Sequence, residues 1–442
     1  MIQSQYRLDR KKSEHYDIKM REIKKPLPKM NLTRRMPGKP VTSGINKIAA
    51  AGAKGIVEEL DRMKKKLAAC LLALAMATAF SGCKGRNAAQ NSAGSLIRIG
   101  FIGPLTGSAS SCGQSSRKGL QLLEDQINRQ GGISGKKVKI IYADDKGNAA
   151  VSVNEGKKLI GSDKVAAIIG PVTSTCADSL APLCQKSNIP MITGTDTHRA
   201  ITNIGDCIFR TCLTDTLQGK VMAKFAAGYM KVQTAAVFYE SGNSSSADLA
   251  EAFAGSFTGK VVDTETYSAG AGDFKAQLTK IKQHNPEVLF LPESSGDAAA
   301  IAREARSMGI TSTFLGGSGF DTPEFLTDGG GSANGVYFSS HYSAEDTSGQ
   351  VAQFLSDFQA KYHSKPDVFA ALTYDAGKVL CDSIQKAGSI DADAVKNALK
   401  SYDGNLICGG RMKFDDSRSA VKAAFIIKTI DGRATLYKKL TA

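Results

Sequence analysis

Five hydroxyl-rich segments of the sequence contain side chains that could hold a small polar ligand. They are GPVTST (170–175), TGTDT (193–197), GNSSS (242–246), PESSG (292–296) and GGSG (316–319). Hydroxyl groups, together with the free N–H groups at helix N-termini, bind anions such as a carboxylate. Each segment alone is also explained by Ser and Thr capping the next helix, so the prediction of a binding site depends on all five converging.

Catalytic chemistry is not indicated by any spacing in the chain. There is no G-x-S-x-G sequence, no C-x-x-C pair and only five histidines. The Gly-rich segment 99–114, IGFIGPLTGSASSCGQ, does not have the G-x-G-x-x-G spacing of a dinucleotide site. We therefore predict neither an enzyme nor a cofactor or metal site.

The elements that must position these loops are short apolar strands alternating with amphipathic helices. Strand-like runs occur at 96–103, 137–145, 164–171 and 189–195, and the pattern restarts after Asp215 at 234–240, 287–293 and 313–319. Continuous apolar strands separated by helices predict parallel sheets that are covered on both faces. Ligands of such sheets bind beyond the carboxyl ends of the strands, which is where the hydroxyl-rich loops lie. The predicted fold is α/β, with two Rossmann-like lobes.

The last hundred residues return to helices with apolar stripes and then to two strands. The helices have too few strands beside them for a third domain, so we expect them to pack on the first lobe. Residues 423–430 (AAFIIKTI) and 434–440 (ATLYKKL) predict a hairpin-like pair across Asp431-Gly432.

Residues 63–82 are typical of a secretory signal peptide. Three lysines precede an apolar run, Leu67 to Phe80, which is too short to cross a bilayer, and small residues follow it. The sequence Phe80-Ser81-Gly82-Cys83 resembles a bacterial lipobox, which implies that Cys83 is lipidated and becomes the mature N-terminus. Residues 83–95 then read as a flexible tether.

The first 62 residues are predicted to be a disordered extension that arises from a start codon assigned too early, with Met63 as the true start. The first 82 residues carry +11 of the formal net charge of +15. The high charge therefore does not indicate nucleic-acid binding by the folded part. Seven cysteines remain after Cys70 and Cys83 are removed, an odd number that leaves at least one thiol without a partner in its own chain.

Three segments resemble the leucine/isoleucine/valine-binding protein family, the substrate-binding components of ABC importers with the type I periplasmic binding protein fold. They are residues 99–148, residues 165–193 and IAREARSMGI at 301–310. The resemblance covers residues 96–440. It implies a Venus-flytrap pair of lobes, 96–213 plus 341–412 and 214–340 plus 413–442. Three hinge crossings are expected, near 212–215, 339–341 and 410–416.

The resemblance also implies a set of ligand-binding residues. Ser174 matches the serine that binds the ligand's carboxylate, Thr195 and Thr197 match a second anchoring pair, and Phe369 matches an apolar wall residue.

Several positions depart from the family pattern. Three tyrosines are replaced by Cys112, Ser245 and Ser294, and the acidic residue that receives the ligand's ammonium is replaced by Ser318. Glu293 could take over the ammonium, or it could be a surface glutamate.

These features predict an extracytoplasmic solute-binding lipoprotein of a bacterial cell membrane, held there only by the lipid at Cys83. It would capture an amino acid or a related small polar solute and deliver it to an ABC permease and ATPase complex. The alternative is a sensory ligand-binding module of the same fold that takes no part in transport.

Overall fold

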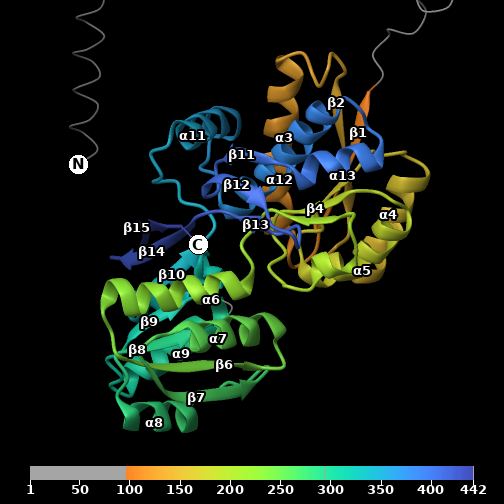
Figure 1. Ribbon diagram of the computed structural model, residues 1–442. Coiled ribbons are helices and arrows are strands. Elements are labelled where there is room, and N and C mark those ends of the chain that lie inside the picture. Colours follow the sequence, from red (N-terminus) through yellow and green to blue (C-terminus); the bar gives the residue numbers. More distant parts are fainter. Residues whose placement is uncertain (1–95, 294, 442) are drawn as a thin grey trace, which may run out of the picture. The chain divides into compact units, whose positions relative to one another are not determined.

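The computed structural model describes residues 96–441 apart from Ser294, and it confirms the predicted α/β fold with mainly parallel sheets (Figure 1). The predicted extension, signal peptide, lipidation site Cys83 and tether lie outside the described residues, as does Ser294. Within the described part of the chain, no helix is both long and apolar enough to cross a membrane. The seven cysteines of this part are all unpaired.

The first sheet contains five parallel strands in the order β2-β1-β3-β4-β5. On β1, Ile99 and Phe101 enter one apolar cluster and Ile102 enters another, because successive side chains of a strand point to opposite faces. Both faces are therefore buried. The strands are β1 (Ile97–Gly103), β2 (Val138–Asp144), β3 (Ile168–Ile169), β4 (Met191–Thr193) and β5 (Ile208–Arg210).

Helices cover both faces of this sheet (Figure 1). Leu120 of α3 and Leu380 of α12 join the cluster of Phe101, whereas Leu159 of α4 and Leu180 of α5 join the cluster of Ile102. The helices are α3 (Ser110–Arg129), α4 (Ala149–Gly161), α5 (Ser174–Lys186), α12 (Val368–Ala387) and α13 (Ala392–Lys400), with a short 3₁₀ turn η1 (Ile201–Ile204).

A close helix contact fixes the start of α12, which carries Phe369. A β-carbon at Gly119 of α3 would lie 2.2 Å from the carbonyl oxygen of Ala370. Only glycine permits this approach, because any side chain there would displace the first turn of α12.

The second sheet has seven strands in the order β15-β14-β10-β9-β8-β6-β7. The first five of its strands along the chain are parallel, and β14 is antiparallel to both β10 and β15. The predicted pairing of residues 423–430 with 434–440 is confirmed by β14 and β15. The strands are β6 (Thr234–Ser241), β7 (Lys260–Ser268), β8 (Val288–Leu291), β9 (Thr313–Gly316), β10 (Tyr337–Ser340), β14 (Ala424–Ile430) and β15 (Arg433–Leu440).

Two apolar clusters also bury the faces of the second sheet. Val221 of α6 and Phe253 of α7 pack with Phe290 of β8, whereas Leu278 of α8 and Ile301 of α9 belong to the opposite cluster. The helices are α6 (Asp215–Lys224), continued by a π-helical turn η2 (Phe225–Met230), α7 (Ser244–Ser256), α8 (Lys275–His284), α9 (Ser295–Ser307) and α10 (Pro323–Gly329), with 3₁₀ turns η3 (Ser318–Phe320) and η4 (Gly330–Ala333).

A third, three-stranded sheet contains β11 (Asp403–Leu406), β12 (Gly410–Phe414) and β13 (Ala420–Val421). Met412, Phe414 and Ala420 are buried in the same cluster as Phe101 of the first sheet. The chain therefore passes to the second sheet only between β13 and β14, later than the crossing expected at 410–416. The burial of alternate residues on β12 keeps this segment on the first core. The other lobe boundaries stay predictions.

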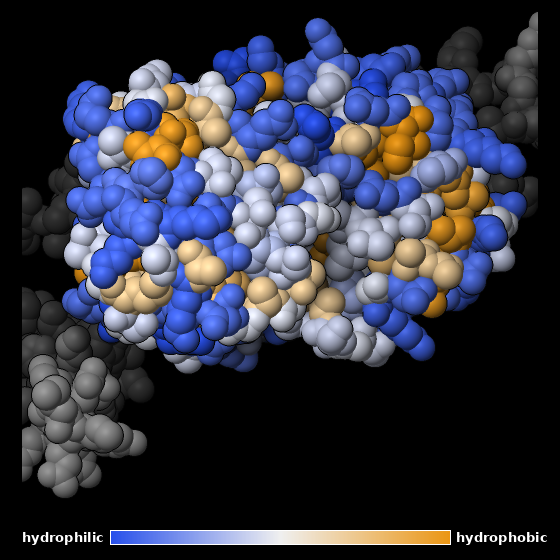
Figure 2. Space-filling view, turned by 90° about the horizontal axis from the view of Figure 1, so that it is seen from below, coloured by the Kyte–Doolittle hydropathy of each residue, from blue (hydrophilic) through white to orange (hydrophobic). Residues whose placement is uncertain are grey.

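The helix α11 (Gly349–Tyr362) packs beside α12 through Phe354 and Phe358, in a cluster that includes Ala371 and Leu372. The face seen in Figure 2 is mainly hydrophilic, with its hydrophobic residues in small separate patches. Isolated exposed apolar side chains of this kind are common on soluble domains.

Candidate ligand-binding site

Loops from the carboxyl ends of strands in both sheets surround a cavity of about 310 Å³. The predicted convergence of hydroxyl-rich loops is therefore seen for the segments after β4, β6, β8 and β9. Six of the predicted site residues line this cavity: Thr195, Thr197, Ser245, Glu293, Ser318 and Phe369.

The wall that comes from the first sheet is hydroxyl-bearing and apolar. Thr195 and Thr197 follow β4, and the Thr195 hydroxyl donates to the carbonyl oxygen of Val172 at 2.7 Å. This bond orients the threonine and leaves its oxygen able to accept a hydrogen bond. Phe369 and Leu372 of α12 supply the apolar part of the wall.

The opposite wall contains a buried carboxylate that the sequence analysis did not select. Asp215, the first residue of α6, is 3% exposed and lines the cavity. Burial raises the pKa of Asp215 to about 6, while the neighbouring hydroxyls of Thr197 and Ser245 favour its ionised form. Its Oδ2 atom is buried and has no hydrogen-bond partner among the described residues. Such an oxygen is suited to accept a hydrogen bond from a cationic ligand.

Ser318 lies in the loop after β9, where its backbone N–H donates to Oε1 of Gln218 at 2.9 Å. The same Oε1 accepts the Ser339 hydroxyl at 3.0 Å. Gln218 thus ties α6 to the ends of β9 and β10. Asp321, three residues after Ser318, is a second cavity carboxylate that the sequence analysis missed.

Glu293 is buried, at 4% exposure, so its interpretation as a surface glutamate is wrong. One carboxylate oxygen accepts the backbone N–H of Glu240 at 2.5 Å, and the other accepts the Ser246 hydroxyl at 3.3 Å. Burial raises the pKa of Glu293 to about 7, against the opposing effect of the Tyr267 hydroxyl.

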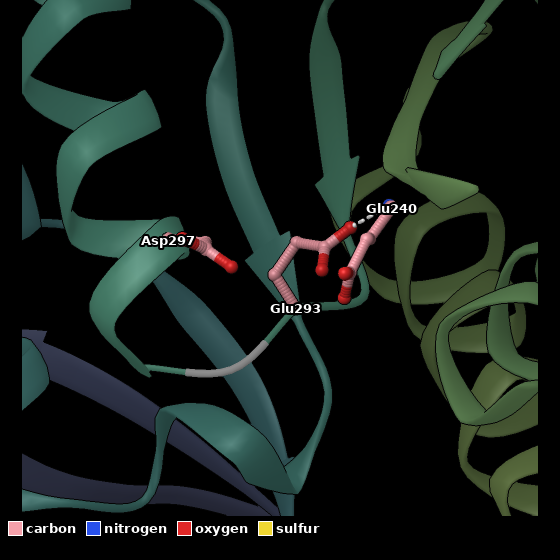
Figure 3. A group of neighbouring side chains, drawn as sticks. All are labelled: Glu240, Glu293 and Asp297. Carbon is pink, nitrogen blue, oxygen red and sulfur yellow. Dashed lines mark hydrogen bonds between the residues drawn. The ribbon is translucent and has the colours of Figure 1, made fainter. Parts of the chain in front are cut away.

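Figure 3 shows Glu293 between Glu240 and Asp297, with the bond to the Glu240 backbone dashed. One carboxylate oxygen from each of the three lies within 4.8 Å of the others. Because both Glu293 oxygens already accept hydrogen bonds, we interpret Glu293 as a support for the ends of β6 and β8.

Ser174 and Cys112 are not among the residues that line this cavity. Ser174 is the first residue of α5, and its hydroxyl favours the ionised form of Asp196, although burial raises the pKa of Asp196 overall. Cys112 is half-buried on α3, where its thiol donates to the carbonyl oxygen of Ala109 at 2.8 Å.

His341 lines the cavity where the chain leaves the second sheet. It is 3% exposed, and its Nδ1 atom accepts the backbone N–H of Leu213 at 3.3 Å. Burial, reinforced by the charge of Lys422, lowers the pKa of His341 to about 3. The imidazole is therefore neutral at physiological pH and joins two of the predicted hinge segments, 212–215 and 339–341.

The missed residues have a common sequence signal. Asp215, Asp321 and His341 each follow the end of a strand by one to five residues. A search of strand-end loops for charged groups as well as hydroxyls would have found them.

Comparison with known proteins gives a family for this chain. Residues 96–434 match the family model described as "Periplasmic binding protein". A protein from Rhizobium johnstonii, "Leu/Ile/Val-binding protein BraC3", is 32% identical over 311 residues, which cover 69% of this chain and 83% of the relative. The Pseudomonas aeruginosa "Leucine-, isoleucine-, valine-, threonine-, and alanine-binding protein" is 27% identical over 71% of this chain and 84% of its own length.

Solved structures agree with this assignment. The branched-chain amino acid transporter substrate-binding protein LivJ from Streptococcus pneumoniae, in complex with isoleucine, has a TM-score of 0.71 and 29% identity, over 79% of this chain and 100% of that chain. The leucine-binding protein LivK from Thermotoga maritima has a TM-score of 0.70 and 28% identity, over 78% and 99%. The family binds solutes and is not an enzyme family. This chain therefore belongs to the periplasmic binding protein family, as a substrate-binding protein of the branched-chain amino acid ABC transporter type.

Proposed function

We propose that this protein is a lipid-anchored extracytoplasmic receptor that captures an amino acid or a related small polar solute and delivers it to an ABC permease. The observation that carries the proposal is the cavity itself. A hydroxyl-bearing wall and the buried residue Asp215, whose Oδ2 atom has no hydrogen-bond partner among the described residues, line the same 310 Å³ space.

A zwitterion suits these two walls. Its carboxylate would lie toward Thr195 and the N-terminus of α5, where Ser174 and the free backbone N–H groups favour an anion. Its ammonium would donate to Asp215, which would take the role that was one of two alternatives for Glu293. An apolar stem would pack on Phe369.

Binding would proceed by hinge closure. Residues of both sheets line the cavity, so a ligand that contacts both walls stabilises a closed arrangement over an open one. The closed form would then dock on the permease.

A panel of amino acids and small carboxylates, tested by thermal shift on the chain that starts at Cys83, checks the proposal. We expect at least one amino acid to raise the melting temperature, because a ligand that binds only the folded state stabilises it. If no amino acid does so while another class of solute does, the proposed ligand class is wrong.

The anchor needs a separate experiment on the native protein. Mass spectrometry should find lipid on Cys83 and no peptides from residues 1–62, because the predicted signal peptide and the lipobox-like sequence imply a mature N-terminus at Cys83. Native peptides from residues 1–62 would contradict this processing.

A further inference from the structure

The charges around the cavity are unbalanced. Asp215, Glu293 and Asp321 line it, whereas no Lys or Arg belongs to the lining residues that the structure describes. His341, the one lining histidine, is neutral. The α-ammonium of an amino acid would neutralise one carboxylate, which leaves two to explain.

Glu293 does not call for a ligand, because both of its oxygens already accept protein hydrogen bonds. Asp321 differs from it. Its Oδ2 atom accepts the Ser340 hydroxyl, but no side chain or backbone group of the described residues donates to its Oδ1 atom. Burial raises the pKa of Asp321 to about 6; the Ser340 hydroxyl opposes this shift, and the nearby charge of Asp367 adds to it.

Asp321 belongs to the walls of two cavities. It lines the 310 Å³ cavity and an adjoining cavity of about 380 Å³, and Thr322 and Val368 also line both. In the adjoining cavity the Tyr342 hydroxyl is buried without a hydrogen-bond partner among the described residues, and Tyr342 is 5% exposed.

The charged groups of the adjoining cavity do not neutralise Asp321. They are Glu345, Lys365 and Asp367. Glu345 accepts the backbone N–H of Leu436, and Asp367 caps α12 by accepting the N–H of Ala370. Lys365 is exposed and is not among the groups that shift the pKa of Asp321.

We propose that the ligand is an amino acid whose side chain ends in a second cation, an amine or a guanidinium, which lies at Asp321 and reaches toward Tyr342. The inference rests on the proposed function, since it places the α-ammonium at Asp215. Val368, Phe369 and Leu372 line the same cavity as the two carboxylates and suit the methylene groups of such a side chain. A half-buried carboxylate with one oxygen that no described protein group bonds gains from a charged partner.

Isothermal titration with matched ligand pairs tests the proposal. Lysine is compared with norleucine and arginine with citrulline, because each neutral partner keeps the shape and loses the charge. We expect at least one cationic ligand to bind ten times or more tightly than its neutral partner. Asp321→Asn should reduce this ratio to about threefold or less and leave the neutral partner's affinity nearly unchanged.

The control is Glu324→Gln, which removes one exposed negative charge close to Asp321 in the sequence and should keep the full ratio.

Neutral partners that bind as well as the cationic ligands would overturn the inference and leave the proposed function standing. A charge preference that persists in Asp321→Asn would overturn the assignment to Asp321. If no amino acid binds the native protein, the amino-acid ligand class of the proposed function is wrong and the inference fails with it. Should the Asn variant not fold, the paired titrations of the native protein still decide the charge preference.

Discussion

The two walls of the cavity differ in charge. Thr195, Thr197 and Phe369, on the side of the first sheet, offer hydroxyl groups and an apolar ring. Asp215 and Asp321, on the side of the second sheet, offer carboxylates. In this account the opposite ends of a zwitterion go to opposite walls. Under the proposed binding mode neither wall alone would recognise an amino acid, so recognition would be coupled to closure.

The largest expected effect comes from removing the charge of the acidic wall. Asp215→Asn should weaken binding of the tightest amino acid by about 3 kcal/mol or more, roughly 150-fold, because a buried ligand cation would lose its charged partner. Isothermal titration measures this loss. Asp297→Asn is a matched control, since Asp297 lies in the first turn of α9 as Asp215 does in α6, but outside the cavity lining. Equal affinities for the two variants would remove Asp215 from the site.

The predicted role of Ser174, which begins α5 outside the cavity lining, is tested by Ser174→Ala. Loss of a hydrogen bond to the ligand's carboxylate should weaken binding by about 1.5–3 kcal/mol, roughly 10- to 150-fold. The melting temperature without ligand should barely change. Thr175→Ala, at the exposed next position of α5, should keep native affinity. An unchanged affinity for Ser174→Ala would leave Ser174 as a helix-start residue without a binding role.

Asp215 should also destabilise the ligand-free protein at neutral pH. Its pKa rises from 3.8 to about 6 on folding, so the folded state binds this proton more tightly than the unfolded chain. The ionised Asp215 therefore lowers the free energy of unfolding by its full amount above about pH 6. This destabilisation decreases as the pH falls toward about 4.

We expect the free energy of unfolding of ligand-free Asp215→Asn to exceed that of the native protein by about 1–3 kcal/mol at pH 7.5, and by less than half as much near pH 4.5. Urea unfolding at the two pH values measures both differences. If the native protein is as stable as the variant at pH 7.5, the ionised Asp215 carboxylate does not destabilise the ligand-free protein, and the prediction is wrong.

The smallest expected effect concerns the volume of the site. The resemblance noted in the sequence aligns Ser245, which lines the cavity, and Cys112 and Ser294 with tyrosines of the family, and from this we expect a plain aliphatic side chain to leave space and unpaired hydroxyls. Leucine or valine should bind at least tenfold more weakly than some bulkier or more polar solute. Titration of such a panel decides the point, and leucine as the tightest ligand would contradict it.

The fold and part of the site followed from local patterns in the sequence. Apolar strands such as β1 and β8 and the glycine-rich turns after them are local signals, and hydroxyls at strand ends indicated the cavity. Asp215 and Asp321 were missed because a single acidic residue near a helix start has an ordinary role as a dipole partner. Only the three-dimensional structure shows that one oxygen of each carboxylate, Oδ2 of Asp215 and Oδ1 of Asp321, has no donor among the described residues. The sequence did not predict that the chain crosses to the second sheet only between β13 and β14. The position of this crossing depends on Met412 and Phe414 being buried in the core of the first sheet, which the sequence pattern does not reveal.

A crystal structure of the protein with its tightest amino acid ligand would show directly which wall holds each end of the ligand. We expect the α-ammonium within about 3.2 Å of the Asp215 carboxylate and the ligand's carboxylate on the opposite wall, near Thr195 and the N-terminus of α5. A ligand bound in the reverse orientation, or one that leaves Asp215 without contact, would contradict the assignment of the two walls.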